Sequence, residues 1–70
     1  MDIKSAVGNR IKVLRNERGY SQEELADRAG IDRTYLTSVE RGKRNISIVN
    51  IEKIAIALDV GIAEIFIKKD

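Results

Sequence analysis

The chain has 70 residues, a formal net charge of +2, and no cysteine, histidine or proline. A chain of this length buries only ~60% of its unfolded surface, so a compact helical core is the arrangement we expect. The missing residue types exclude disulfides and catalysis through His or Cys and leave little to bind zinc. We therefore expect neither a metal site nor a cofactor.

No segment is apolar over a membrane-spanning length, and the N-terminus lacks the apolar region of a signal peptide. We therefore expect a cytoplasmic protein without a membrane partner, folded as a single domain over residues 1–70. The pI of about 9.2 is only mildly basic. Any argument for nucleic-acid binding must come from where the charges are placed, not from their total.

The first predicted helix covers residues 3–18. Apolar side chains recur there at the spacing of a buried helical stripe, at Val7, Ile11 and Leu14. Gly8 falls inside this helix, where we expect it to lie against a close neighbour.

Two short helices joined by a tight turn are predicted between residues 22 and 41. Ser21 followed by Glu24 is a capping-box pattern that starts the first of them. Gly30 ends that helix, because glycine tolerates the left-handed conformation common at helix C-termini. Asp32 is a favourable N-cap for the next helix.

The second of these two helices has one apolar side and one polar side. Leu36 and Val39 face inward, and Leu25, Ala26 and Ala29 of the preceding helix form a small apolar face. Such a layout is typical of a helix that lies in the DNA major groove. The outward residues are Arg33, Thr34, Thr37, Ser38 and Arg41.

A basic loop over residues 41–45 leads to a fourth helix, predicted over residues 48–58 with Ser47 as its N-cap. A fifth short helix follows Gly61. We therefore predict an all-α fold of five helices. The expected core stripe of the fourth helix is Ile48, Ile51, Ile54, Ala55 and Leu58.

Spaced positions along most of the chain match a known pattern. They are Arg15, residues 21–26 (SQEELA), Gly30, Leu36, Val39, Glu40, Gly42, Ile48, Ile51, Ala55, Leu58, Val60, Ile62 and Ile65. The chain thus resembles Cro/C1-type helix-turn-helix domains, the lambda-repressor-like (XRE) family. Residues 32–45, DRTYLTSVERGKRN, resemble the controller proteins of restriction–modification systems. The resemblance implies a five-helix lambda-repressor-like domain and a homodimer on a palindromic operator in double-stranded DNA.

The resemblance implies contacts to DNA bases at Arg33, Thr34 and Ser38. Arginine at the start of a recognition helix can pair bidentately with guanine O6 and N7. As alternatives, Arg33 could be a solvated residue paired with Asp32 or another acid, and the two hydroxyls could be ordinary surface groups. In controller proteins the arginine at the position of Arg44 also reads bases.

The family uses the glutamine at Gln22 to touch a phosphate and to brace the recognition helix; it could also be only a good helix former. The Tyr35 hydroxyl can donate to a phosphate, although burial against the first helix is the alternative. Positive charges beside the recognition helix suit phosphate contacts, although a charge run is otherwise a solvated loop. The remaining predicted phosphate contacts are Thr37, Arg41, Lys43 and Asn45.

The family also has a partly buried ion pair at the positions of Arg15 and Glu40. This pair would hold the first helix to the third. Without it, the Glu40 carboxylate would be an unpaired negative charge close to DNA phosphates, which is unfavourable.

A dimer interface is predicted on the fourth and fifth helices. Val49 and Ile56 lie off the core stripe and share another face, where related family members usually carry polar residues. A two-fold dimer through this surface would set two recognition helices ~34 Å apart. Alternatively, both residues pack against the fifth helix within one subunit. The remaining predicted interface residues are Ile62, Ile65, Phe66 and Ile67.

The predicted function is a sequence-specific transcriptional regulator that acts by occupying DNA and by blocking or recruiting RNA polymerase. The alternative is an antitoxin-like or other protein-interaction module that uses the same fold. An enzyme is disfavoured, because the chain has no His or Cys and no phosphate-binding loop of the G-x-x-x-x-G-K-[ST] type.

Overall fold

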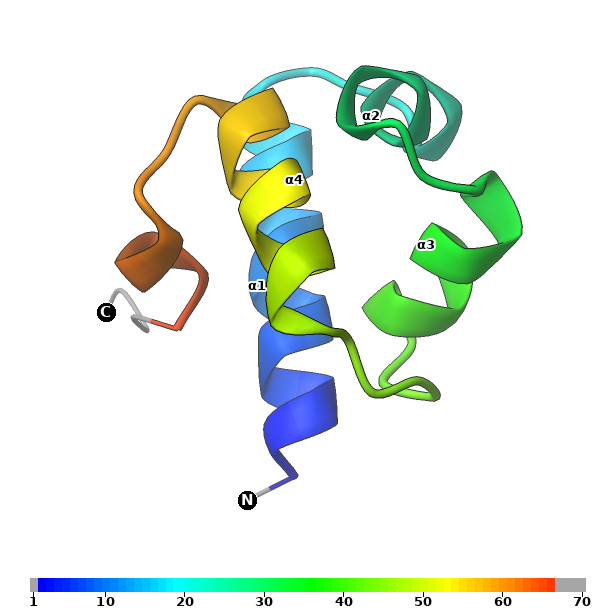
Figure 1. The fold of residues 1–70 in the computed structure, drawn as a ribbon, viewed down its shortest axis with the longest axis vertical. Coiled ribbons are helices and arrows are strands. Elements are labelled where there is room, and N and C mark those ends of the chain that lie inside the picture. The colour runs from blue at the N-terminus through cyan, green and yellow to red at the C-terminus, as the bar shows by residue number, and fades with distance from the viewer. Residues whose placement is uncertain (1, 67–70) are drawn as a thin grey trace.

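Four α-helices and one 3-10 turn make up the computed structural model, which describes residues 2–66 (Figure 1). The elements are α1 (Ile3–Glu17), α2 (Gln22–Ala29), α3 (Arg33–Glu40), α4 (Ile48–Leu58) and η1 (Ile62–Ile65). In Figure 1, α2 and α3 lie on one side of the α1–α4 pair and η1 lies on the other. Within this part of the chain no helix is both long and apolar enough to cross a membrane.

Side-chain caps set the starts of all four α-helices, and at α1 the Asp2 carboxylate accepts the Lys4 N–H at 3.0 Å. The predicted N-caps Ser21, Asp32 and Ser47 are confirmed, since their oxygens accept backbone N–H groups three residues on at 3.0, 3.0 and 3.1 Å. Only this half of the predicted capping box forms at α2. The Glu24 carboxylate instead accepts hydrogen bonds from the Arg28 guanidinium at 3.0 and 3.1 Å.

The hydrophobic core lies between α1, α4 and the α2–α3 pair and contains most of the predicted stripes. Ile48 is an error of that prediction, because its side chain is 75% exposed. It shares a helical face with Ile51 but occupies the first position of α4, which the neighbouring helices leave uncovered. The buried apolar residues are Val7, Ile11, Leu14, Leu25, Ala26, Ala29, Leu36, Val39, Ile51, Ile54, Ala55, Leu58 and Ile65.

The predicted fifth α-helix is a single 3-10 turn in the described chain. The N–H groups of Glu64 and Phe66 bond to the carbonyl oxygens three residues earlier, both at 3.0 Å. The Glu64 carbonyl oxygen accepts a hydrogen bond from Arg10 Nε at 2.8 Å, which ties η1 to α1. Arg10 is itself buried, and its Nη2 atom has no partner among the described residues.

The predicted close neighbour of Gly8 is the end of α3. A Cβ atom at this position would overlap the Val39 carbonyl oxygen and lie 2.9 Å from that of Glu40. Both obstacles are backbone atoms, which cannot move aside as a flexible side chain can. The absence of a side chain at Gly8 therefore sets how closely α1 approaches α3.

We predict that Gly8→Ala lowers the free energy of unfolding by ~1–3 kcal/mol, the usual cost of overpacking. This loss should appear although alanine favours a helix by about 1 kcal/mol over glycine. Gly61→Ala is the matched control, because nothing lies within 4 Å of its Cβ position. Urea denaturation followed by circular dichroism compares the two variants. Equal stability of both would show that the close approach at Gly8 is not required.

Candidate nucleic-acid interface

The polar side of α3 is open to solvent. Its apolar residues Leu36 and Val39 are buried against the core, with 0% and 1% of their surface exposed. Arg33 and Thr34 are exposed, and Ser38 is half-buried. The three residues of α3 that were predicted to contact bases therefore lie on the uncovered side of the helix.

Arg33 meets an acid of the preceding helix. Its Nη1 atom lies 3.6 Å from Oε2 of Glu23, and the two side chains are 62% and 71% exposed. The alternative of a surface ion pair is therefore realised in this structure, with Glu23 rather than Asp32 as the partner. Such exposed pairs contribute only ~0.2–1 kcal/mol, so the guanidinium is readily released to a stronger bidentate acceptor.

Gln22 joins the two helices of the motif through both atoms of its amide. Its Oε1 accepts a hydrogen bond from Thr37 Oγ1 at 2.9 Å, and its Nε2 donates to Glu40 Oε1 at 3.0 Å. Gln22 thus braces α3 as predicted. Thr37 gives its only O–H to this contact and has no donor left for a phosphate oxygen in this arrangement. The phosphate contact of Thr37 stays a prediction, and it would require this hydroxyl group to change its hydrogen-bond partner.

The predicted ion pair between Arg15 and Glu40 is present and bidentate. Arg15 Nε donates to Glu40 Oε2 at 2.7 Å, and Nη2 donates to Oε1 at 3.0 Å. The two side chains are only 10% and 2% exposed. Arg15 Nη1 donates to the carbonyl oxygen of Tyr20 at 2.9 Å, so the guanidinium also holds the turn before α2.

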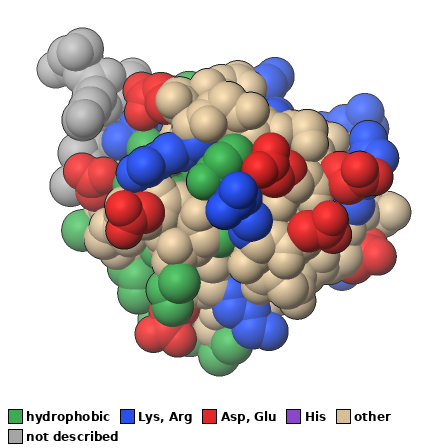
Figure 2. Space-filling model, turned by 90° about the horizontal axis from the view of Figure 1, so that it is seen from above, with side chains coloured by type: hydrophobic (Ala, Val, Ile, Leu, Met, Phe, Trp, Pro, Cys, Tyr) green, Lys and Arg blue, Asp and Glu red, His purple; other side chains and the backbone are tan. Residues whose placement is uncertain are grey.

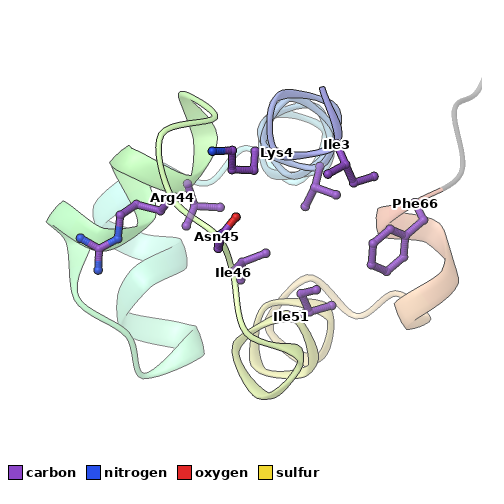
Figure 3. Close-up of a pocket in the computed structure, with 9 residues that line it drawn as sticks. Ile3, Lys4, Arg44, Asn45, Ile46, Ile51 and Phe66 are labelled. Carbon is purple, nitrogen blue, oxygen red and sulfur yellow. The ribbon is translucent and has the colours of Figure 1, made fainter. Parts of the chain in front are cut away.

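The basic loop follows α3 directly, and its long polar side chains are exposed. Arg44 lies over the ring of Tyr35, with its guanidinium carbon 5.0 Å from the ring centroid. Figure 3 shows the Arg44 side chain extending toward α3 and away from Phe66. The exposed loop residues are Arg41, Lys43, Arg44 and Asn45.

Tyr35 is half-buried, and its hydroxyl group meets α4. The phenolic oxygen accepts a hydrogen bond from Asn50 Nδ2 at 3.1 Å. The predicted phosphate contact requires the hydroxyl proton, which this hydrogen bond leaves free. The alternative placed Tyr35 against the first helix. Its hydroxyl group instead has its hydrogen-bond partner, Asn50, on α4.

Positive charge is concentrated on α3 and the following loop. Residues 33–45 contain Arg33, Arg41, Lys43 and Arg44 and a single acid, Glu40, whose charge is paired and buried. Figure 2 views the end of the molecule that is uppermost in Figure 1, where acidic and basic side chains are interspersed. The uneven placement of charge, rather than its total, marks α3 as the side that suits a polyanion.

Comparisons with known proteins agree with this geometry. The family model described as Helix-turn-helix matches residues 11–65. The chain belongs to the helix-turn-helix family. It is a DNA-binding transcriptional regulator of the Cro/C1 type.

This helix-turn-helix protein is similar to restriction–modification controller proteins. It is 48% identical to control protein C.MunI of Mycoplasma sp over 66 residues, which are 93% of this chain and 89% of that protein. The crystal structure of the controller C.AhdI from Aeromonas hydrophila matches with a TM-score of 0.91 and 47% identity, over 94% of this chain and 100% of that one. The biofilm regulator SinR in complex with DNA matches with a TM-score of 0.82 and 44% identity, over 86% and 97% of the chains.

The helix-turn-helix protein also leaves apolar side chains uncovered on α4 and η1. Val49 and Ile56 are 58% and 72% exposed, so the alternative that they pack inside one subunit is wrong. Ile65 was predicted at the interface but is 1% exposed, because it points into the core. Ile67 lies outside the described residues. We call the exposed members the α4–η1 patch: Val49, Ile56, Ile62 and Phe66.

Phe66 forms one wall of a shallow groove of about 150 Å³ between the start of α1, the basic loop and η1 (Figure 3). Apolar residues such as Ile3, Ile46 and Ile51 form most of its surface. None of its lining residues within the described part of the chain is a carboxylate. Residues 2–66 contain no cluster of three or more His, Cys, Asp or Glu that could hold a metal ion.

Some polar residues with long-range contacts were not singled out from the sequence, Asn50 and Arg10 among them. Asn50 reaches the Tyr35 hydroxyl, 15 positions away, and Arg10 reaches the backbone of η1, 54 positions away. A signal existed for Arg10, since it follows Val7 by three residues and lies at the edge of the apolar stripe of α1. For Asn50 no local pattern exists, because its partner lies on another helix.

We predict that Arg15→Met lowers the free energy of unfolding by ~3–5 kcal/mol, because Glu40 is left as a buried and unpaired charge. The double variant Arg15→Met with Glu40→Leu should recover much of this loss. Arg28→Met is a control that breaks an exposed pair with Glu24 and the contact of the guanidinium with the Tyr20 ring, 4.5 Å from its centroid, and it should have a much smaller effect. Chemical denaturation measures all variants. If the losses of unfolding free energy caused by Arg15→Met alone and by Glu40→Leu alone simply add up in the double variant, Arg15 and Glu40 do not interact.

Proposed function

We propose that this helix-turn-helix regulator binds a palindromic operator as a homodimer and acts as a restriction–modification controller protein in the cytoplasm. It works by occupying DNA near a promoter and changing the access of RNA polymerase, without catalysing a reaction. The observation that carries the proposal is the open polar side of α3, with four basic residues in residues 33–45 and their single acid buried in an ion pair.

The polar side of α3 supports reading of bases in the major groove. The exposed N-terminal residues Arg33 and Thr34 are placed where a recognition helix reaches base edges. The position of α3 is held by Gln22 from α2 and by Arg15 from α1. A helix fixed from two sides can present its donors in one orientation, as discrimination between base pairs requires.

The basic loop supports contacts with the sugar–phosphate backbone. Arg41, Lys43 and Asn45 are exposed directly after α3, where the backbone of a bound duplex would pass. Their charges and donors suit phosphate oxygens, which supply affinity and register rather than sequence information. Arg44 is stacked on Tyr35 at the edge of α3 and is placed to contact a base beside the α3 footprint.

The α4–η1 patch supports a homodimer. Exposed apolar patches mark interaction surfaces, and a two-fold axis lets one patch cover its own copy. In Figure 2 uncovered hydrophobic side chains gather at the lower left edge of the view. In each subunit the α4–η1 side of the fold is separate from the exposed side of α3, so association leaves both recognition helices free.

The specific role as a controller rests on the similarity to C.MunI and C.AhdI. The alternative is a module that mainly binds another protein through the same apolar patch. Selection of bound sequences from a random duplex pool separates the two. The proposal expects enrichment of a palindrome, and recovery of random sequence would contradict it.

We predict that Arg33→Ala weakens operator binding by ~1–3 kcal/mol and relaxes discrimination at one base pair per half-site. Lys43→Ala provides the contrast: it should weaken binding to all sequences alike and reduce the salt slope by about one charge. Titrations of selected and random duplexes at several salt concentrations distinguish the two patterns. Equal loss on both duplexes for Arg33→Ala would make Arg33 a phosphate contact.

We also predict that the double change Val49→Glu with Ile56→Lys yields a folded monomer at micromolar protein concentration. Charges on both sides of a two-fold interface would be desolvated, whereas in the monomer these positions are in water. Val13→Glu, on an exposed position of α1, is the control and should leave the dimer intact. Analytical ultracentrifugation gives the oligomeric state. A double variant that remains folded and dimeric places the interface elsewhere.

A further inference from the structure

Two successive contacts connect α4 to the predicted DNA-reading side of the molecule. Asn50 Nδ2 donates to the Tyr35 hydroxyl at 3.1 Å, and the Tyr35 ring carries the Arg44 guanidinium at 5.0 Å. We infer that Asn50 is a positioning residue for operator reading, which sets the Tyr35 hydroxyl and, through the ring, Arg44. The inference rests on the proposed function, because it concerns how the same DNA site is held.

The direction of the Asn50 hydrogen bond decides what the Tyr35 hydroxyl can do. A phenolic hydroxyl has one proton to donate and lone pairs to accept with. Because the Asn50 amide nitrogen is the donor, the oxygen uses a lone pair and the proton stays available. A phosphate oxygen can only accept, so a tyrosine held in this way is matched to it.

The same hydrogen bond fixes the orientation of the Tyr35 ring, on which the Arg44 guanidinium is stacked. Arg44 is exposed and comes from a loop, so a free side chain would lose much rotamer entropy on binding DNA. Stacking on Tyr35 restricts it beforehand, and the ring is anchored at its far end by Asn50. Figure 3 shows Arg44 directed toward α3, the element that carries Tyr35.

Asn50 is itself held firmly. Its backbone N–H donates to the Ser47 hydroxyl at 3.1 Å, the N-cap contact of α4. Its side chain is half-buried and is not a member of the apolar core. Removal of the Asn50 amide should therefore change the affinity for DNA more than the free energy of unfolding.

The test is a double-mutant cycle between Asn50→Leu, which keeps the side-chain size, and Tyr35→Phe. Each variant is titrated with the operator selected by the wild-type protein, with operators altered at single base pairs and with random duplex. Asn16→Leu, at an exposed asparagine of α1, is the control. Denaturation and ultracentrifugation accompany each titration, and Asn50→Ser, too short to reach the hydroxyl, replaces Asn50→Leu if the latter alters the fold or the dimer.

We expect Asn50→Leu to lose operator affinity by roughly 5- to 10-fold, the effect of one hydrogen bond. The difference in affinity between the selected operator and operators altered at the base pairs read by Arg44 should become smaller. The salt slope should stay unchanged, because no charge is removed. The double variant should bind no more weakly than Tyr35→Phe alone, since both changes break the same contact.

Additive losses in the cycle would overturn the role of Asn50. Equal losses on operator and random duplex would overturn its effect on base reading through Arg44, because loss of a phosphate contact alone weakens binding to both duplexes alike. The role would also be overturned if Asn50→Leu kept the operator affinity and discrimination of the wild-type protein, or lost no more of either than Asn16→Leu does. If the wild-type protein selected no operator at all, both the proposed function and this inference would fail. If it selected an operator but Asn50→Leu gave one of the contrary results above, only this inference would fail.

Discussion

The buried carboxylate of Glu40 is the point on which the geometry of the molecule depends. It accepts two hydrogen bonds from Arg15 of α1 and one from Gln22 of α2, while its own backbone ends α3. Three helices therefore meet at one charge, which is stable in the interior only while these donors remain. The same contacts remove a negative charge from the side of α3 that would face phosphates. Fold and DNA binding thus impose the same requirement on this residue.

The fourth helix couples two surfaces that the sequence places far apart. Its outer side carries Val49 and Ile56 of the α4–η1 patch, and Asn50 on the same turn reaches Tyr35 of α3. In a dimer formed through the patch, the path from one recognition helix to the other would run through two copies of this rigid helix. The spacing of ~34 Å that a palindrome demands would then be set by packing within α4 and α3 rather than by a flexible linker.

Local rules of sequence account for most of the fold. The caps at Ser21, Asp32 and Ser47 were predictable because each contact spans three residues, and the apolar stripes because helical spacing is regular. Errors arose where distant parts of the chain decide the outcome. Ile48 has core spacing but no covering neighbour, and Ile65 points into the core instead of an interface. In the site, the ion pair followed from a family resemblance, whereas the hydrogen bonds that occupy the Thr37 hydroxyl and anchor Tyr35 required the packed helices.

Glu40 and Glu23 illustrate two ways in which negative charge is accommodated near α3. Glu40 is neutralised permanently, by a buried bidentate pair at 2.7 and 3.0 Å. Glu23 is exposed and holds Arg33 through a single contact at 3.6 Å, which water and salt weaken. Breaking the Arg15–Glu40 pair would disrupt the packing of α1 against α3, whereas breaking the Arg33–Glu23 pair only frees the Arg33 guanidinium. If Arg33 reads a guanine as proposed, the exposed Glu23 carboxylate has only a small effect on affinity, because two hydrogen bonds to the base replace one long contact.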